Sequence, residues 1–257
     1  MDKKIKKALE LFKNKEWEKA IDAFSRILEK ETDDAGLYNN LALCYYNLGE
    51  IQSAEKFYLK ALGINPQLVE VYINLADLYF NQRNFSDAIG LLQSATAEMP
   101  ENLVLKHFLA RVYMEDAQID LAIDELDKIL EAQPENFDAY YDLGRIYFEL
   151  GSYDLAIENF ENVLQYKDDN VWVYYHLGQA YEANDEVEKA LSNHLKAIAR
   201  DETFYPAYKK VGILFLARND FDDAIEYFED YIKLGVPEEE INIIKKVIER
   251  AKVQKEG

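Results

Sequence analysis

Residues 35–68 read AGLYNNLALCYYNLGEIQSAEKFYLKALGINPQL, and residues 69–102 read VEVYINLADLYFNQRNFSDAIGLLQSATAEMPEN. The two segments align without a gap, and the alignment continues in both directions along the chain at a constant spacing of 34 residues. The twentieth residue of every 34-residue segment is alanine, from Ala20 through Ala54 to Ala224. Self-similarity at a fixed period is the sequence signature of a repeat protein.

Other positions of the repeat keep their size and polarity along the chain. Position 8 is always Ala or Gly, position 11 is aromatic in six of seven repeats, and position 7 is Leu or Val after the first repeat. Small residues at positions 8 and 20 would allow two helices of one repeat to approach closely. The larger residues at positions 7, 11 and 24 would fill the space between neighbouring repeats.

The periodicity within a repeat is helical. Apolar residues recur three and four positions apart, as at Tyr72, Leu75, Ala76 and Tyr79, and a second such series follows in the same repeat. Turn signals such as Leu48-Gly49 separate the two series. Proline cannot continue a helix, so the second helix should end before Pro66, Pro100 and Pro134. Each repeat is therefore predicted to hold two short helices, which must stack on neighbours to bury their apolar faces.

This pattern resembles the tetratricopeptide repeat (TPR), most clearly within residues 35–68. The matching residues there are Tyr38, Leu41, Ala42, Tyr45, Ala54, Tyr58, Ala61 and Pro66. The resemblance implies an all-α fold, a right-handed α-solenoid of seven helix-turn-helix hairpins. We expect the repeats at 1–34, 35–68, 69–102, 103–136, 137–170, 171–204 and 205–238, and a C-terminal capping helix at 239–257. Lys4 and Lys7 replace the expected Tyr and Leu in the first repeat, as suits a helix without a preceding neighbour.

Composition excludes several classes of protein. The 257 residues carry 29 Lys and Arg against 49 Asp and Glu, a net charge of −20, which argues against a nucleic-acid partner. The single cysteine, Cys44, excludes a disulfide framework. Neither a secretory signal nor an apolar run of membrane-spanning length is present, so we expect a soluble, cytoplasmic protein. The basic first helix could contact a membrane surface, but the first helix of a solenoid shows the same pattern.

The TPR resemblance implies that the first helix of each repeat lines a concave groove, with positions 2, 5, 6, 9, 12 and 13 pointing into it. The candidate residues for binding a peptide or protein there are Asn40, Asn74, His107, Arg111, Tyr141, Arg145, Trp172, Tyr175, His176 and Gln179. The alternative for each of them is that it merely solvates an exposed face.

These residue types suit a peptide ligand. Asn40 and Asn74 share position 6, and an amide can both donate to and accept from a peptide backbone. Arg111 and Arg145 share position 9 and could bind carboxylates, unless they pair with a neighbouring Asp77 or Asp142. The aromatic residues could anchor an apolar side chain of the partner, since Trp and Tyr are enriched at binding hot spots.

No catalytic, metal-binding or cofactor-binding constellation is evident. His107 and His176 are two repeats apart, too far to share a metal ion, and no phosphate-binding glycine loop occurs. We therefore expect a non-catalytic protein–protein interaction scaffold that binds a peptide or protein segment. Two alternatives remain open: a self-assembling structural scaffold and a targeting or adaptor subunit of a separately encoded enzyme. The first two repeats have no net charge and the later ones are acidic, which could favour head-to-tail association in a homo-oligomer.

Overall fold

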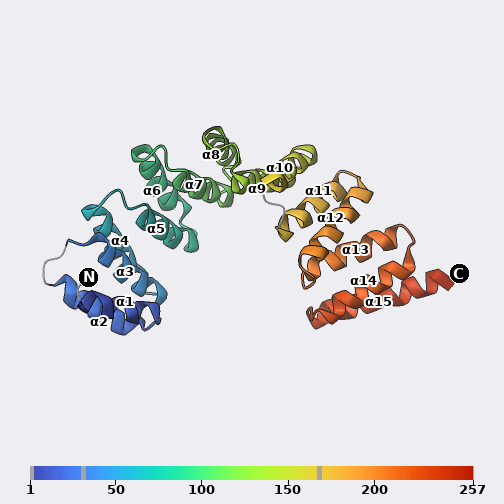
Figure 1. Ribbon diagram of the computed structural model, residues 1–257, viewed down its shortest axis with the longest axis horizontal. Helices are drawn as coiled ribbons and strands as arrows, with labels where there is room; N and C mark the ends of the chain where they lie inside the picture. Colours follow the sequence, from blue (N-terminus) through green and yellow to red (C-terminus); the bar gives the residue numbers. More distant parts are fainter. Residues whose placement is uncertain (1–2, 30–32, 167–169, 257) are drawn as a thin grey trace. The chain divides into compact units, whose positions relative to one another are not determined.

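The computed structural model describes residues 3–29, 33–166 and 170–256, and their regular secondary structure consists of fifteen α-helices without a β-strand (Figure 1). The contacts within the chain divide it into two compact units, the N-terminal unit (Met1–Ile129) and the C-terminal unit (Leu130–Gly257). The all-α repeat fold expected from the sequence is confirmed. The two units are considered separately below.

Helices follow one another in pairs joined by short turns. The N-terminal unit contains α1 (Lys3–Lys13), α2 (Trp17–Leu28), α3 (Ala35–Asn47), α4 (Ile51–Ile64), α5 (Val69–Asn81), α6 (Phe85–Glu98), α7 (Leu103–Glu115) and most of α8 (Ile119–Ala132). The C-terminal unit contains α9 (Phe137–Glu149), α10 (Tyr153–Tyr166), α11 (Val171–Ala183), α12 (Val187–Arg200), α13 (Tyr205–Ala217), α14 (Phe221–Lys233) and α15 (Glu238–Glu256). The helices keep the 34-residue spacing, while the limits of the individual repeats stay a prediction.

The turn inside each pair has the same geometry in all seven repeats of the described chain. The residue at position 15 has a left-handed backbone, with φ between 57° and 77°. The N–H of the next residue donates to the carbonyl five positions back, as Glu50 does to Tyr45 at 2.9 Å. This is the Schellman motif that ends many helices. Glycine, which adopts this backbone most easily, occupies position 15 only at Gly49 and Gly151.

The other ends of the helices are also marked by specific residues. Asp34, Asn102 and Asn136 each accept a hydrogen bond from a backbone N–H in the first turn of the helix that follows, at 3.0 to 3.1 Å. Such N-caps satisfy donors that have no partner within the helix. Pro66 and Pro100 lie two residues beyond the ends of α4 and α6, as their inability to continue a helix predicts.

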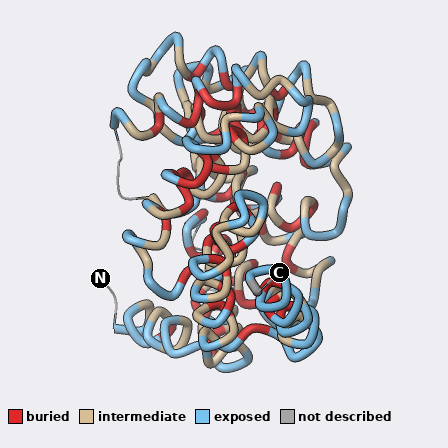
Figure 2. The backbone as a smooth tube through the Cα atoms, turned by 90° about the vertical axis from the view of Figure 1, so that its right-hand side faces the viewer, coloured by how far each residue is buried: buried red, intermediate tan, exposed pale blue. Residues whose placement is uncertain are grey.

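The packing inside a pair explains the small residues at position 8. A Cβ added at Gly144 would lie only 2.6 Å from the ring of Phe160 on α10, and Gly178 and Gly212 have the same relation to His194 and Phe228. Position 8 is therefore small because the side chain at position 24 lies directly on it. The alanines at position 20 are fully buried in all seven repeats. Figure 2 shows buried residues alternating with exposed ones along the helices.

The two ends of the chain differ from the repeats between them. Lys4 and Lys7 on α1 are exposed, whereas Tyr38 and Leu41 at the same positions of the next repeat are buried. At the other end, α15 buries Ile244 and Ile248 against a cluster that includes Phe228 of α14. Within the described ranges, no helix combines the length and the apolar character needed to cross a membrane.

Candidate functional site

All ten candidate residues lie on the first helix of a repeat, and two of them, Tyr141 and Tyr175, also pack against buried core clusters. We call the side of α3, α5, α7, α9 and α11 that carries positions 2, 5, 6, 9, 12 and 13 the first-helix face. Because the two units are separate bodies, this face is described in two parts, one on α3, α5 and α7 and one on α9 and α11.

A chain of side-chain hydrogen bonds crosses from α3 to α5 in the N-terminal unit. Asn74 Nδ2 donates to Asn39 Oδ1 at 3.0 Å, and Asn39 Nδ2 donates to Glu70 Oε1 at 3.2 Å. Asn39 is buried, with 4% of its surface exposed. The amide of Asn74 is thus partly used by the protein itself, although its oxygen remains available. Asn40 is half-buried and makes no side-chain hydrogen bond to another described residue, so both its donor and its acceptor are available to a ligand.

A second polar group lies further along the same two helices. Tyr46 Oη donates to Asp77 Oδ2 at 3.3 Å, and Asn81 Nδ2 lies 2.7 Å from Tyr46 Oη and 2.9 Å from Asp77 Oδ2. Burial raises the pKa of Tyr46, and the negative charge of Asp77 raises it further. The sequence-based list of candidates omits Asn39, Glu70 and Asp77. Their groove positions 5, 2 and 9 were the signal that could have included them.

An aromatic cluster occupies the first-helix face of the C-terminal unit, with His176 at its centre. The centroid of the His176 ring lies 5.8 Å from that of Tyr141, 5.9 Å from Trp172 and 5.6 Å from Tyr175. The buried ring of Phe160 stacks on the His176 ring, with 5.9 Å between the two centroids. Trp172 nevertheless has 47% of its surface exposed. The structure therefore brings together four of the predicted residues and leaves a large aromatic surface open to a partner.

His176 is held in one orientation by Gln179 on the same helix. His176 Nδ1 lies 3.0 Å from Gln179 Oε1. An amide oxygen only accepts hydrogen bonds, so this contact is a hydrogen bond in the tautomer that carries its proton on Nδ1. Burial lowers the pKa of His176, the bond to Gln179 opposes this, and the positive charge of Arg145 lowers it further. His176 therefore contributes a neutral ring, which suits an apolar anchor pocket.

The two candidate arginines have different surroundings. Arg145 Nη1 lies 3.6 Å from Asp142 Oδ1, so the pairing that the sequence left open is present for this residue. Arg111 lies over the ring of Phe108, with 5.6 Å between the guanidinium carbon and the ring centroid. Arg111 and His107 belong to the N-terminal unit and Arg145 to the C-terminal unit, so a carboxylate site shared by both arginines stays a prediction.

Cys44 and His194 have side chains of types that can support catalysis or metal binding, but both are buried in the core. Burial raises the pKa of the Cys44 thiol to about 12, so this side chain is a packing residue. His194 is fully buried, as a core histidine would be. In the part of the chain that the structure describes, no three His, Cys, Asp or Glu side chains are grouped so that they could hold a metal ion.

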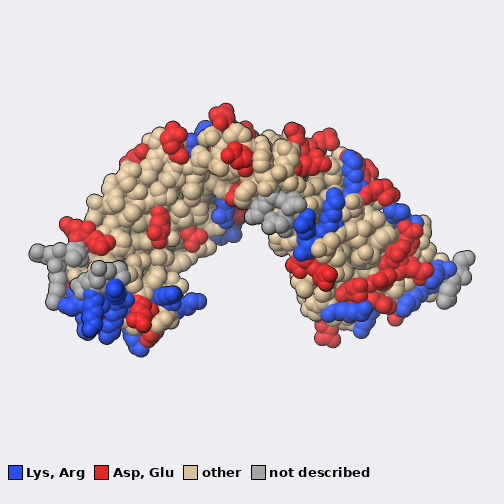
Figure 3. Space-filling model, viewed as in Figure 1, with Lys and Arg blue, Asp and Glu red and all other residues tan. Residues whose placement is uncertain are grey.

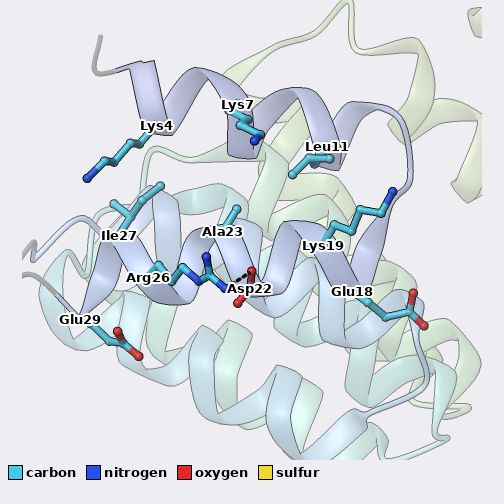
Figure 4. A pocket seen from close by; sticks show the side chains of 10 residues that line it. All are labelled: Lys4, Lys7, Leu11, Glu18, Lys19, Asp22, Ala23, Arg26, Ile27 and Glu29. Carbon is cyan, nitrogen blue, oxygen red and sulfur yellow. Dashed lines mark ion pairs between the residues drawn. The ribbon is translucent and has the colours of Figure 1, made fainter.

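A cleft of about 760 Å³ opens at the N-terminal end, between α1 and α2 (Figure 4). Its apolar floor includes Leu11 and Ala23, and its charged lining is mixed, with the basic Lys4, Lys7, Lys19 and Arg26 and the acidic Glu18, Asp22 and Glu29. Arg26 pairs with Asp22 at 3.0 Å. Figure 3 shows Lys and Arg gathered over α1 and α2, on a chain whose net charge is −20.

Comparison with solved structures shows the same fold in other proteins. The C-terminal part of a TPR repeat-containing protein from Cytophaga hutchinsonii is similar, with 21% identity over 92% of this chain and 98% of that one and a TM-score of 0.71. A tetratricopeptide repeat protein from Parabacteroides merdae has 19% identity over 97% of both chains and a TM-score of 0.67. YrrB, a TPR protein with an unusual peptide-binding site, has 25% identity over 73% of this chain and 96% of its own, with a TM-score of 0.55.

Family models identify the repeat from the sequence itself. Models described as tetratricopeptide repeat match residues 35–68, 82–143 and 114–158, and one described as TPR repeat matches residues 144–185. A comparison with curated protein sequences gave no match. The matched segments lie in both units, and the match to residues 35–68 coincides with the helix pair α3–α4. The chain therefore belongs to the tetratricopeptide repeat family.

Proposed function

We propose that this protein is a non-catalytic interaction scaffold that binds a peptide or protein segment on its first-helix face. Proteins of the TPR family generally mediate protein–protein interactions. The observation that carries the proposal is the aromatic cluster of Tyr141, Trp172, Tyr175 and His176. Trp172 has nearly half its surface exposed, while one edge of its side chain packs against Phe204 at 4.8 Å between the ring centroids. Exposed Trp and Tyr side chains next to a polar surface are the groups that most often dominate binding energy.

Each set of residues has a role in this proposal. Asn40 would hold the backbone of the partner with an amide that the protein does not use itself. The oxygen of Asn74 would accept from a backbone N–H, while its nitrogen stays bonded to Asn39. Trp172 and Tyr175 would enclose an apolar side chain of the partner. Similarity to YrrB, a TPR protein with an unusual peptide-binding site, supports a peptide as the ligand.

The test begins with a random peptide library selected against the immobilised full-length protein. Fluorescence anisotropy then measures the affinity of the selected peptides for the variant Asn40→Ala/Trp172→Ala. A matched control, Leu59→Ala/Leu155→Ala, removes exposed apolar side chains from the second helices of two repeats. Circular dichroism verifies that all proteins are folded.

We expect the first variant to weaken binding about tenfold or more, as the loss of a hot-spot residue does, and the control to leave it unchanged. Peptides that bind both variants equally, or that depend on Leu59 and Leu155 instead, would place binding elsewhere. A library that yields no binder would contradict peptide binding altogether.

Self-association is a second candidate, favoured by the lysines and arginine gathered over α1 and α2. The occupant would be an acidic surface of a second copy, attracted by Lys7, Lys19 and their neighbours. Sedimentation velocity at rising protein concentration would then show oligomers that dissociate as salt screens the charges. The variant Lys7→Glu/Lys19→Glu should remain monomeric under the same conditions. A wild-type protein that is monomeric at all concentrations would exclude this candidate.

A further inference from the structure

The first-helix face of the second and third repeats has no cationic side chain. Helix α3 contains no charged residue at all, and α5 contains only Glu70 and Asp77. These two residues are seven positions apart, which places them two turns apart on the same side of the helix, at roughly 10 Å along its axis. The face therefore carries two separate negative charges in a row.

Both carboxylates are held by neutral donors. Glu70 accepts from Asn39, and Asp77 accepts from Tyr46 and Asn81. Neither carboxylate forms an ion pair with a Lys, Arg or His of the described residues. A carboxylate has about four lone-pair sites, so each retains acceptor capacity as well as its charge. The hydrogen bonds hold the two groups in place without neutralising them.

A buried hydroxyl next to these carboxylates also has no partner. Tyr58 on α4 is 0% exposed, and its Oη forms no hydrogen bond within the described chain. Burial raises the pKa of Tyr58, and the charges of Tyr46, Asp77 and Glu70 raise it further. Buried polar groups normally have a partner, and this hydroxyl has none among the described residues.

The packing of the repeat does not require this hydroxyl. Tyr58 occupies position 24, where three other repeats have the phenylalanines Phe24, Phe160 and Phe228. Those rings are also fully or almost fully buried. A phenyl ring would therefore fill the same space. The packing of the repeat does not account for the oxygen of Tyr58.

We propose that this surface binds a basic segment of a partner protein, with one Lys or Arg side chain at Glu70 and another at Asp77. The surface, which we call the α3–α5 acidic surface, consists of Asn39, Tyr46, Glu70, Asn74 and Asp77. The assignment rests on the proposed function, because it names the chemistry of the segment bound there. A polyproline II segment has three residues per turn and rises about 3.1 Å per residue, so two basic residues separated by two others lie on one side of it, about 9 Å apart, close to the spacing of the carboxylates.

Other ligand classes fit this geometry less well. A single divalent cation needs oxygen ligands within about 2.0 to 2.6 Å, which two carboxylates roughly 10 Å apart cannot both supply. An acidic segment would be repelled by both charges. A guanidinium presents a fork of N–H donors that matches a carboxylate, and Asn74 would hold the backbone between the two basic side chains.

The test must separate this surface from the general attraction of a chain with a net charge of −20. The probe is a fluorescein-labelled peptide with two arginines separated by two alanines, titrated with the full-length protein. The variant Glu70→Gln/Asp77→Asn removes two charges and keeps the acceptor oxygens for Asn39 and Tyr46. The control Glu98→Gln/Glu101→Gln removes the same two charges from exposed positions in the same unit.

We expect about tenfold weaker binding for Glu70→Gln/Asp77→Asn, because two half-exposed ion pairs are lost, and less than a twofold change for the control. Equal weakening by both variants would show that only the overall charge attracts the probe. No weakening by either would overturn the assignment as well.

Failure here is distinct from failure of the proposed function. The affinity of the selected peptides can fall in the variant Asn40→Ala/Trp172→Ala while the affinity of the arginine probe is unchanged in Glu70→Gln/Asp77→Asn. In that case only the assignment of a basic segment is wrong. If neither dependence is found, the first-helix face is not the binding surface.

Discussion

At position 8 of the last three repeats, a glycine lies directly beneath the side chain at position 24. Gly144 and Phe160 show the relation most clearly, because a Cβ on the glycine would lie 2.6 Å from the ring. Phe160 is 1% exposed and has no open space into which it could move. Protein interiors are packed too densely to absorb an added carbon without strain. The pairing of residues at positions 8 and 24 therefore sets how closely the two helices of a repeat approach.

We predict that Gly144→Ala lowers the free energy of unfolding by about 1–3 kcal/mol, the usual cost of overpacking a core. Gly90 on α6 is a matched control, because it is also helical but has no atom within 4 Å of an added Cβ. Gly90→Ala should raise the free energy of unfolding by about 0.5–1 kcal/mol, since alanine is the better helix former. Urea unfolding followed by circular dichroism measures both. Similar effects of the two substitutions would contradict the close packing at Gly144.

His194 is the exception among the large residues at position 24. It is fully buried, neither ring nitrogen has a hydrogen-bond partner in the described chain, and its Nε2 lies 3.7 Å from the Glu182 carboxylate. Glu182 is itself bonded to Lys210 at 2.6 Å. Burial lowers the pKa of His194, and Glu182 opposes this only in part. The side chain is therefore neutral in the folded protein at neutral pH.

We predict that His194→Phe raises the free energy of unfolding at pH 7 by about 1–2 kcal/mol, because two unsatisfied buried nitrogens are removed. Gly178 already leaves space for a ring at this position. Below the ordinary histidine pKa of about 6.5, the unfolded state binds a proton that folded His194 resists. The stability of the wild type must therefore fall as the pH is lowered through this range. His176, whose pKa is also lowered, contributes in the same direction.

Chemical unfolding at several pH values between 5 and 8 tests this prediction. As the pH falls, the free energy of unfolding of the variant should decrease less steeply than that of the wild type. The variant should still show the smaller decrease that His176 causes. Identical pH profiles would show that His194 does not resist protonation in the fold.

At the scale of elements, the turn between the two helices of a repeat is the most uniform feature. All seven turns place position 15 in the left-handed region, whether the residue is glycine or not. Ala117 adopts φ of 57° there, which costs energy because its Cβ is crowded. The hydrogen bond from Gln118 N–H to the Tyr113 carbonyl at 2.9 Å holds this conformation in place.

Reciprocal substitutions should therefore have opposite effects. We predict that Ala117→Gly raises the free energy of unfolding by about 0.5–1 kcal/mol, and that Gly49→Ala lowers it by about 1 kcal/mol. No atom lies within 4 Å of a Cβ added at Gly49, so that effect comes from the backbone alone. Thermal unfolding of the two variants beside the wild type provides the measurement. A stabilising Gly49→Ala substitution would be incompatible with the left-handed turn.

The helices could be predicted from the sequence because their signals repeat. The apolar spacing of Tyr72, Leu75 and Tyr79, the proline after the second helix and the alanine at position 20 recur with the same period. The turns at Lys15 or Asp185 carry no local signal of a left-handed residue. They follow only from their alignment with Gly49 and Gly151. The 34-residue period thus carries information that each turn lacks by itself.

The candidate site could be predicted only in part, because position on a helix does not reveal the partner of a side chain. The sequence placed Tyr141, Trp172, Tyr175 and His176 on one face, and their rings are indeed in contact. It could not show that Asn74 is bonded to Asn39 across two repeats. That bond depends on the approach of α3 and α5, which helical periodicity does not determine.

For the whole molecule, the distribution of charge and aromatic surface distinguishes one region from another. Basic side chains gather at α1 and α2, as Figure 3 shows. The carboxylates of Glu70 and Asp77 follow on α5, and the aromatic cluster with the exposed Trp172 lies on α11 in the C-terminal unit. In a repeat protein each repeat contacts only its neighbours. Such regions can therefore differ in chemistry without disturbing the fold.

The most direct measurement is hydrogen–deuterium exchange of the full-length protein with and without a selected peptide, resolved to single helices. Our account predicts slower exchange in the first helices of the repeats, α3 and α5 or α9 and α11, when the peptide is bound. The second helices, such as α4 and α10, should exchange at unchanged rates. Protection confined to the second helices, or to the α1–α2 cleft, would contradict the claim that the first-helix face is where this protein binds its partner.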